Sequence, residues 1–326
     1  MNLLSVVVPC HNEEDVIERL HAEVMSHAGA VADRVELVLV DDGSADRTLT
    51  LAQALAAADP RVRVISFSRN FGKEAAMLAG LRAAEGDAVV VMDADLQHPP
   101  ELLKVLVETY EQGFDQVLAK RTRDGDPKLR SVLSRAYYRG INRLVDVPLA
   151  DGVGDFRLLS RPAVDALLAL GEVNRFSKGL FSWIGFDQAI IEYTNVQRAA
   201  GATTWTLKML LNYGIDGVMS FNNKPLRASI WMGLWVVGLS FLYVVWLIFN
   251  AVTGSIDVPG YITIVAAVTG LGGIQLIFLG VIGEYIGRIY YETKARPHYI
   301  IRSDSRRSRT SAPLRPTATE QRPGDL

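Results

Sequence analysis

Two long runs without a charged residue constrain this chain most strongly. Residues 228–256 contain no Asp, Glu, Lys or Arg, and residues 258–283 contain none either, with Asp257 alone between them. Each run exceeds the ~20 residues that a helix needs to cross the apolar core of a bilayer. Two such runs in succession are rare in water-soluble folds. The sequence therefore predicts a hairpin of two transmembrane helices, at about 229–252 and 260–283.

The charges on either side of these runs predict their orientation. Lys224 and Arg227 precede the first run, Arg288 and Lys294 follow the second, and the connection at 254–260 carries no Lys or Arg. Basic residues are retained on the cytoplasmic side of a membrane. We therefore expect a multi-pass protein of the cell (inner) membrane with both termini and the N-terminal region in the cytoplasm.

The first 120 residues alternate between short apolar runs and amphipathic stretches. Runs rich in Val, Ile and Leu are typical of strands buried on both faces, and the stretches between them have helical spacing. This alternation indicates an α/β domain of Rossmann-like type, with a parallel sheet covered by helices. The predicted strands are 4–9, 36–40, 62–67, 88–92 and 116–119, and the predicted helices are 13–27, 46–58, 73–84 and 100–112.

The composition along the chain suggests four segments. We assign 1–204 to a cytoplasmic α/β domain and 228–287 to the two spans and their connection. Residues 205–227 mix apolar positions at helical spacing with polar ones, which favours a helix lying in the membrane interface. Residues 288–326 form a cytoplasmic C-terminal segment, and its polar, Pro-containing part after Ser303 is predicted to be disordered.

The overall charge and cysteine content exclude some classes of protein. A formal charge of −2 and a pI near 6.2 give no basic character for nucleic-acid binding. Cys10 is the single cysteine, so no internal disulfide forms. The N-terminus lacks the basic start and long apolar run of a cleavable signal peptide. A homo-oligomer is left open.

Polar clusters follow four of the predicted strands. Because ligands bind beyond the carboxyl ends of strands in open α/β sheets, we expect these clusters to share one cleft. They comprise residues 9–13, 41–46, 69–73 and 93–97.

The last of these clusters has the pattern of a metal site. Asp93 and Asp95 stand two residues apart at a strand end, so both carboxylates can face one point. Hard divalent cations prefer oxygen ligands, and Gln97 offers a further neutral oxygen. We expect Mg²⁺ or Mn²⁺ here, bridged to a diphosphate.

The other clusters suit the remainder of a nucleotide. Asp42 can accept hydrogen bonds from a base N–H or a ribose hydroxyl, although a purely structural turn is an alternative. Asp46 is more readily explained as a turn and helix-capping residue. Arg69 and Lys73 can neutralise phosphate oxygens, with surface exposure the alternative for Lys73.

These clusters carry a resemblance to a known family. The motifs VVVPCHNEE, LVLVDDGSADRT, SFSRNFGKEAAMLAGL and VVMDADLQHPPE resemble the inverting family 2 glycosyltransferases of GT-A fold. DGVGDFRLLSR, QRAAGATTW and GVIGEYIGRIYYETKARPHYI narrow the resemblance to the polyprenyl-phosphate (bactoprenol) glucosyltransferase subfamily, related to dolichyl-phosphate mannose synthase. The resemblance covers about residues 3–302. It implies inverting transfer of a hexose, with UDP-glucose the first choice, to undecaprenyl phosphate for cell-envelope glycan modification.

The resemblance also assigns residues to roles. For the donor it implies Pro9, His11, Glu13, Asp42, Arg69, Lys73 and Asp93, and for the metal Asp93, Asp95 and Gln97. Asp95 and Asp155 are implied as catalytic, and Arg121, Arg135 and Arg198 as ligands of the acceptor phosphate.

Two points qualify these roles. A phosphate monoester has a second pKa near ~6 and is largely anionic at neutral pH, so it needs no strong base. We therefore expect Asp155 to orient hydroxyl groups as much as to accept a proton. Relatives commonly carry a lysine where this chain has Thr204, and Lys208 stands one helical turn further on. The departure weakens the acceptor-site assignment.

Three alternatives compete with this interpretation. A processive polysaccharide synthase shares the acidic motifs but typically has a Q-x-x-R-W motif and more spans. A non-catalytic membrane adaptor would keep the fold without needing Asp93, Asp95 and Asp155, which are all present. A nucleotidyltransferase would need a Gly-rich phosphate loop near its N-terminus, and this chain has none there.

Overall fold

A mixed sheet forms the centre of the protein. The computed structural model describes residues 1–122, 153–172, 175, 177–193, 224–253 and 260–306. Within these residues the sheet has eight strands in the order β7-β5-β6-β4-β1-β2-β3-β8. The strands are β1 (Leu3–Cys10), β2 (Arg34–Asp41), β3 (Val62–Phe67), β4 (Ala88–Val91), β5 (Gln116–Arg121), β6 (Val153–Ser160), β7 (Gln188–Tyr193) and β8 (Ile301–Asp304).

The first five strands agree with the sequence-based prediction to within a few residues. β1 pairs in parallel with β2 and β4, and β2 pairs in parallel with β3. Val6, Val7 and Val8 are fully buried, as expected for a strand covered on both faces. The carboxyl ends of these strands therefore meet at one edge of the sheet.

The predicted parallel sheet is confirmed for β1 to β4, but the complete sheet is mixed. β6 lies between β4 and β5 and is antiparallel to both, and β8 is antiparallel to β3. The apolar pattern of a strand does not record its direction, so the sequence could not distinguish these cases. The reversal has a functional consequence, because β6 begins at the edge where its neighbours end.

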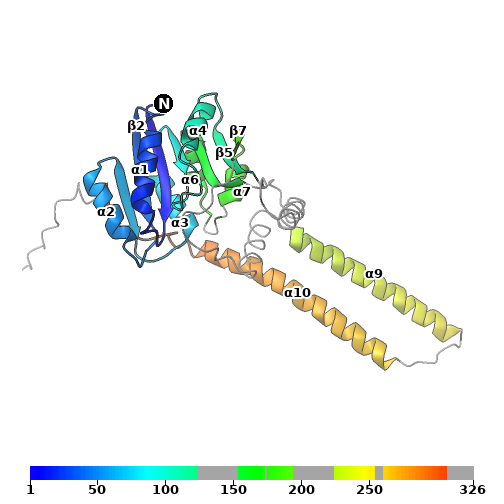
Figure 1. Ribbon diagram of the computed structural model, residues 1–326. Coiled ribbons are helices and arrows are strands. Elements are labelled where there is room, and N and C mark those ends of the chain that lie inside the picture. The colour runs from blue at the N-terminus through cyan, green and yellow to red at the C-terminus, as the bar shows by residue number, and fades with distance from the viewer. Residues whose placement is uncertain (123–152, 173–174, 176, 194–223, 254–259, 307–326) are drawn as a thin grey trace, which may run out of the picture.

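Helices cover both faces of the sheet (Figure 1). α1, α2 and α4 pack on one face around Ile17, Leu20 and Leu103, and α3, α6 and α7 pack on the other around Met77 and Phe181. Their bounds are α1 Ile17–Ala28, α2 Thr48–Ala58, α3 Lys73–Ala83, α4 Leu102–Tyr110, α6 Arg161–Ala169 and α7 Ser177–Trp183.

α3 lies unusually close to the sheet at Gly80. A Cβ at this position would overlap Cγ1 of Val7 on β1 and lie 3.3 Å from Cγ2 of Val40 on β2. Glycine therefore allows α3 to approach the two central strands, and Lys73 at the start of α3 is held beside their carboxyl ends.

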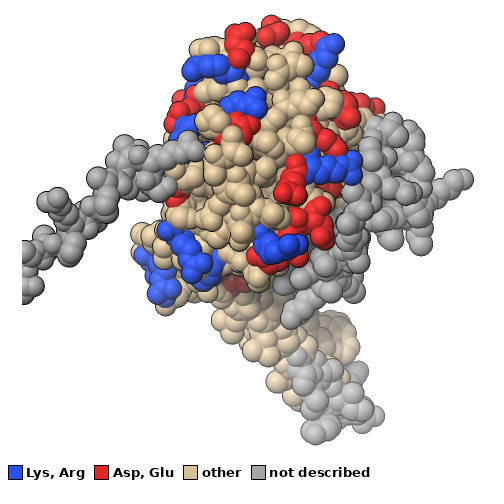
Figure 2. All heavy atoms as spheres, turned by 60° about the vertical axis from the view of Figure 1, so that its left-hand side comes forward, with Lys and Arg blue, Asp and Glu red and all other residues tan. Residues whose placement is uncertain are grey.

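Two long helices, α9 (Lys224–Val252) and α10 (Tyr261–Thr293), extend side by side from the domain (Figure 1). Large apolar side chains on them face outward: Trp235 and Leu276 are each 70% exposed. Figure 2 shows acidic and basic side chains spread over the α/β domain, whereas the described hairpin surface in that view is mostly uncharged. Among the described residues, one helical segment, Gly270–Thr293, has the length and apolar composition to cross a membrane, and Trp231–Tyr243 is a shorter apolar segment.

Several sequence-based expectations fall outside the described residues. They are the interfacial helix at 205–221, the connection between the spans at 254–259, and the tail from 307 onward. The predicted disorder after Ser303 is wrong for residues 304–306, because Asp304 completes β8 and Arg306 forms ion pairs with the domain.

Candidate active site

The carboxyl ends of the central strands form an acidic cleft. Cys10 ends β1 and Asp41 ends β2, and β4 ends two residues before Asp93. β6 starts at the same edge, which places Asp155 opposite the end of β4. The cleft has a volume of about 310 Å³. It is lined by Pro9, Cys10, His11, Glu13, Asp42, Asn70, Gly72, Lys73, Ala76, Asp93, Ala94 and Asp95.

Lys73 joins two of the acidic residues. Its Nζ lies 2.6 Å from Oδ1 of Asp93 and 2.5 Å from Oδ2 of Asp155. Partial burial lowers the pKa of Lys73, but the two carboxylates outweigh that effect and raise the pKa above its usual range. Lys73 is therefore a permanent cation in the cleft. The Lys73 side chain is 43% exposed, so it contacts both carboxylates from the open side of the cleft.

Asp155 is surrounded by cations. Burial raises its pKa, but Lys73, Lys178 and Arg157 outweigh burial and leave the pKa below its usual value. A carboxylate with a lowered pKa is a weak base at neutral pH. Asp155 is thus suited to orienting polar groups and balancing charge. Lys178 was not predicted from the sequence, because nothing in the chain around it indicates that α7 returns to the cleft.

A hydrogen-bonded turn places α7 beside Asp155. The hydroxyl and the backbone N–H of Ser177, the first residue of α7, both donate to the carboxylate of Glu74 on α3. Arg157 is buried, donates to the Gly154 carbonyl at 2.8 Å, and lies 3.7 Å from the centre of the Phe181 ring. These contacts connect α3, β6 and α7 in the region around the Asp155 carboxylate.

Asp42 organises the loop that follows β3. Its carboxylate accepts the backbone N–H of Phe71 at 2.6 Å and of Gly72 at 2.9 Å. Burial raises the pKa of Asp42, and the two N–H groups oppose that shift. Nδ1 of His11 lies 3.0 Å from the Asp42 carbonyl oxygen, and its Nε2 lies 3.2 Å from Nδ2 of Asn70. Asp42 therefore has a structural task in addition to its place in the cleft wall.

The turn after Asp42 requires glycine. Gly43 has φ +66°, and a Cβ there would lie 2.5 Å from the carbonyl carbon of Arg69. Asp41 accepts the Ser66 hydroxyl at 2.8 Å and the Ser44 N–H at 3.1 Å, so it serves the turn. The loops after β2 and β3 are consequently packed against each other at one end of the cleft.

Asp46 has the structural role that the sequence favoured. It accepts the backbone N–H of Thr48 at 2.9 Å and of Glu14 at 3.3 Å. These bonds tie the start of α2 to the loop after β1.

Asp93 and Asp95 fit a hard divalent cation. Both line the cleft, and the Asp93 side chain is 29% exposed. The intervening turn is constrained, because Leu96 has φ +55° and the Gln97 N–H donates to Oδ1 of Asp95 at 3.1 Å. Within the described residues no group of three or more His, Cys, Asp or Glu could hold a metal. A pair of carboxylates is nevertheless sufficient for Mg²⁺ or Mn²⁺ when substrate phosphates supply further oxygens.

The remaining predicted residues differ in position. The Arg69 guanidinium lies 4.1 Å from the centre of the Phe71 ring and donates to the Asn70 carbonyl, rather than lining the cleft. Arg121 ends β5 at the same edge of the sheet, beside Tyr193 of β7. Arg135, Arg198 and Thr204 lie outside the described residues.

The fold is an open α/β sheet with a polar cleft at the carboxyl ends of its strands, which is where proteins of this class bind their ligands. The chain belongs to glycosyltransferase family 2, whose family model matches residues 5–168. A second model, the GtrB C-terminal hairpin, matches residues 224–289. Family membership and the mixed α/β sheet confirm the expected GT-A-like catalytic domain.

The matches to individual proteins cover nearly the whole chain. The putative glycosyltransferase CsbB of Bacillus subtilis is 54% identical over 300 residues, which are 92% of this chain and 91% of that protein. The bactoprenol glucosyl transferase of Shigella phage SfX is 42% identical over 301 residues, 92% of this chain and 99% of that protein. Among solved structures, glucosyl-3-phosphoglycerate synthase of Mycobacterium tuberculosis with Mn²⁺ and UDP-glucose is 22% identical with a TM-score of 0.42, covering 66% of this chain and 76% of that one. The family assignment depends on the sequence matches.

Proposed function

We propose that this enzyme transfers glucose from UDP-glucose to a polyprenyl phosphate at the cytoplasmic face of the cell membrane. The observation that carries the proposal is that the match to proteins named bactoprenol glucosyl transferase includes both the acidic cleft and the hairpin. The cleft supplies a site for a nucleotide-sugar, and the exposed apolar surface of the hairpin suits a lipid surrounding.

Different residues of the cleft would bind different parts of the nucleotide-sugar donor. Pro9, His11, Glu13 and Asp42 line the cleft and would bind the nucleoside, and the Lys73 ammonium in the same lining would bind the diphosphate. Asp93 and Asp95, with Gln97, would hold Mg²⁺ or Mn²⁺, which when bound neutralises charge on the departing diphosphate. Preorganised charge of this kind is commonly the largest contribution to a transfer reaction.

The transfer itself is a single displacement. A phosphate oxygen of the lipid attacks the anomeric carbon, the bond from that carbon to the nucleoside diphosphate breaks, and the configuration inverts. The attacking phosphate is already anionic at neutral pH, since its second pKa is about 6. The lowered pKa of Asp155 therefore agrees with a role in orienting substrate rather than in removing a proton. Arg121, Arg135 and Arg198 are proposed ligands of the lipid phosphate.

The hairpin would cross the membrane twice. α9 has 29 residues and α10 has 33, and at about 1.5 Å per residue each exceeds the ~30 Å apolar core of a bilayer. Trp231 and Tyr290 are 68% and 54% exposed near the domain-proximal ends, where aromatic side chains favour the interface. This arrangement keeps both termini and the cleft in the cytoplasm.

A direct assay tests this function. Purified protein in vesicles containing undecaprenyl phosphate is incubated with labelled UDP-glucose, UDP-galactose, GDP-mannose or UDP-N-acetylglucosamine. The lipid is then extracted, and the mass of the product is measured by mass spectrometry. We expect one hexose per lipid, from UDP-glucose. Long sugar polymers would instead identify a processive synthase. Absence of both transfer and hydrolysis with every donor would identify a non-catalytic adaptor.

A further inference from the structure

Residues 299–306, which we name the clasp, return the chain from the hairpin to the catalytic sheet. α10 ends at Thr293, and Ala295 adopts φ +46° with its N–H donating to the Glu292 carbonyl at 3.1 Å. A left-handed residue just beyond the last turn is a common way for a helix to end. Tyr299 then stacks on Phe67, the last residue of β3, with ring centres 4.9 Å apart. The connection between membrane helix and sheet is therefore short and held by contacts.

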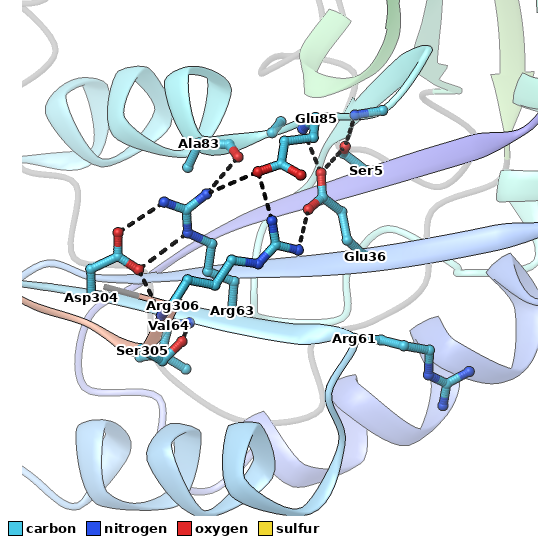
Figure 3. Close-up of polar contacts among 12 residues, drawn as sticks. Ser5, Glu36, Arg61, Arg63, Val64, Ala83, Glu85, Asp304, Ser305 and Arg306 are labelled. Atoms are coloured by element: carbon cyan, nitrogen blue, oxygen red, sulfur yellow. Dashed lines mark hydrogen bonds and ion pairs between the residues drawn. The ribbon is translucent and has the colours of Figure 1, made fainter. Parts of the chain in front are cut away.

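The strand of the clasp is locked to β3 by side chains as well as by pairing. Arg63 donates from Nε and Nη2 to the two oxygens of Asp304, at 3.2 and 2.8 Å. The Asp304 side chain is 3% exposed. Ser305 accepts the Val64 N–H at 3.0 Å. Figure 3 shows these groups converging on the start of β3.

The clasp also supplies a cation to the interior of the domain. Glu36 on β2 has a side chain that is 3% exposed, and its Oε2 accepts Nη2 of Arg306 at 3.0 Å. Its other oxygen accepts the Ser5 hydroxyl at 2.5 Å and the Glu85 N–H at 2.6 Å. Arg306 lies 2.7 Å from the Glu85 carboxylate as well (Figure 3). Because a buried carboxylate is costly without such partners, loss of Arg306 would leave Glu36 with an unfavourable buried charge.

The clasp connects the hairpin to the donor cleft through β3. Ser303 pairs with Ser66, and the Ser66 hydroxyl donates to Asp41 at the base of the cleft-forming turn. β8 begins beside Phe67, at the carboxyl end of β3. α10 therefore meets the domain at the edge of the sheet that carries the cleft.

We propose that the clasp sets the distance and orientation of the cleft relative to the membrane surface. The proposal builds on the glycosyl transfer to a lipid phosphate inferred above. The phosphate of a membrane lipid is confined to a narrow layer, so a displaced cleft misses its attack position even when its own residues are intact. Small errors in the placement of reacting groups reduce rates severely. The clasp residues are positioning residues, because none of them is among the residues that line the cleft.

The test compares a membrane acceptor with a soluble one. Full-length Arg306→Ala and Asp304→Ala variants are assayed with undecaprenyl phosphate in vesicles and with a short, water-soluble prenyl phosphate, and UDP binding is measured by calorimetry. We expect kcat/KM for the vesicle acceptor to fall on the order of tenfold relative to the soluble acceptor, with UDP affinity within about twofold of wild type.

Two further variants serve as controls. Arg61→Ala removes an ion pair with Asp59, at 2.7 Å, that lies apart from the clasp (Figure 3), and it should leave the acceptor ratio unchanged. Arg306→Lys keeps the charge, so its kcat/KM for the vesicle acceptor relative to the soluble acceptor should be close to that of wild type. Equal losses with both acceptors, an unchanged ratio, or lost UDP binding would overturn the proposal. Wild-type protein that glucosylates neither acceptor would refute the proposed function instead.

Discussion

The catalytic domain and the hairpin use similar apolar residues in opposite ways. Phe67 and Phe156 in the domain are fully buried, whereas Trp235 and Leu276 in the hairpin are each 70% exposed. Burial of apolar surface is the main favourable contribution to folding. The domain achieves that burial within its own layers. The hairpin does not, so its stability depends on apolar material outside the described chain, and we propose that this material is the bilayer.

The largest expected effect concerns the cleft and should leave the hairpin unaffected. Asp95→Asn removes one carboxylate from the proposed metal pair and should reduce transfer on the order of 10³-fold, about 4 kcal/mol in the barrier. Membrane extraction and circular dichroism should match wild type. Activity that persists in the presence of EDTA would contradict the metal role of Asp95.

The next largest effect is expected from placing a charge at an exposed apolar position, which should be costly in the hairpin and tolerated in the domain. Leu276→Arg on α10 should cost about 2.5–3.5 kcal/mol of membrane insertion if that position lies near the bilayer centre. Val105→Arg on α4, at a position 40% exposed, should be tolerated because it faces water. Glycosylation-site reporters in the hairpin connection measure insertion. Normal membrane insertion of Leu276→Arg would contradict the proposal that the exposed apolar residues of the hairpin face the bilayer.

Two glycines provide a matched test of packing. Gly80→Ala places a methyl group against Val7 and should destabilise the domain by about 1–3 kcal/mol. A Cβ at Gly273 on α10 has no neighbouring atom within 4 Å in the described structure, so Gly273→Ala should be neutral. Thermal unfolding in detergent, followed by tryptophan fluorescence, compares them. Equal shifts in Tm would contradict the assigned packing.

The smallest effect is pH dependent and confined to the domain. Hydrogen bonds from Arg61 outweigh burial and hold the pKa of Asp59 below its usual range. A lowered folded-state pKa stabilises the fold above the unfolded pKa of about 4, and the contribution is lost as pH falls through the folded value. Asp59→Asn should therefore lower Tm at pH 7, and its difference from wild type should shrink below about pH 4. A constant difference would exclude this linkage.

Local patterns were sufficient to predict most of the first half of the fold. β1 to β4 are continuous apolar runs followed by polar loops, and the order of those loops along one edge predicted a shared cleft that Asp42, Lys73, Asp93 and Asp95 do line. The resemblance to family 2 supplied the rest of the donor assignment. These features depend on residues close together in the sequence.

Long-range pairings were not accessible in the same way. β8 has four residues, two of them charged, and pairs with a strand more than 230 residues earlier, so neither its length nor its composition indicated a strand. The Lys73–Asp155 contact joins residues 82 apart and depends on β6 running antiparallel. The periodicity of residues within one segment does not indicate which distant segment it will pair with or contact.

The place of the clasp in the chain has a consequence for biosynthesis. Glu36 and Arg306 are 270 residues apart, and a ribosome adding about 5–20 residues per second needs roughly 14–54 s to make that stretch. During this time Glu36 on β2 is without Arg306, and both hairpin helices are synthesised before Arg306 is added. The last strand of the catalytic sheet therefore joins only after the hairpin has been synthesised. Completion of the catalytic sheet is thereby timed by translation of the hairpin that precedes its last strand.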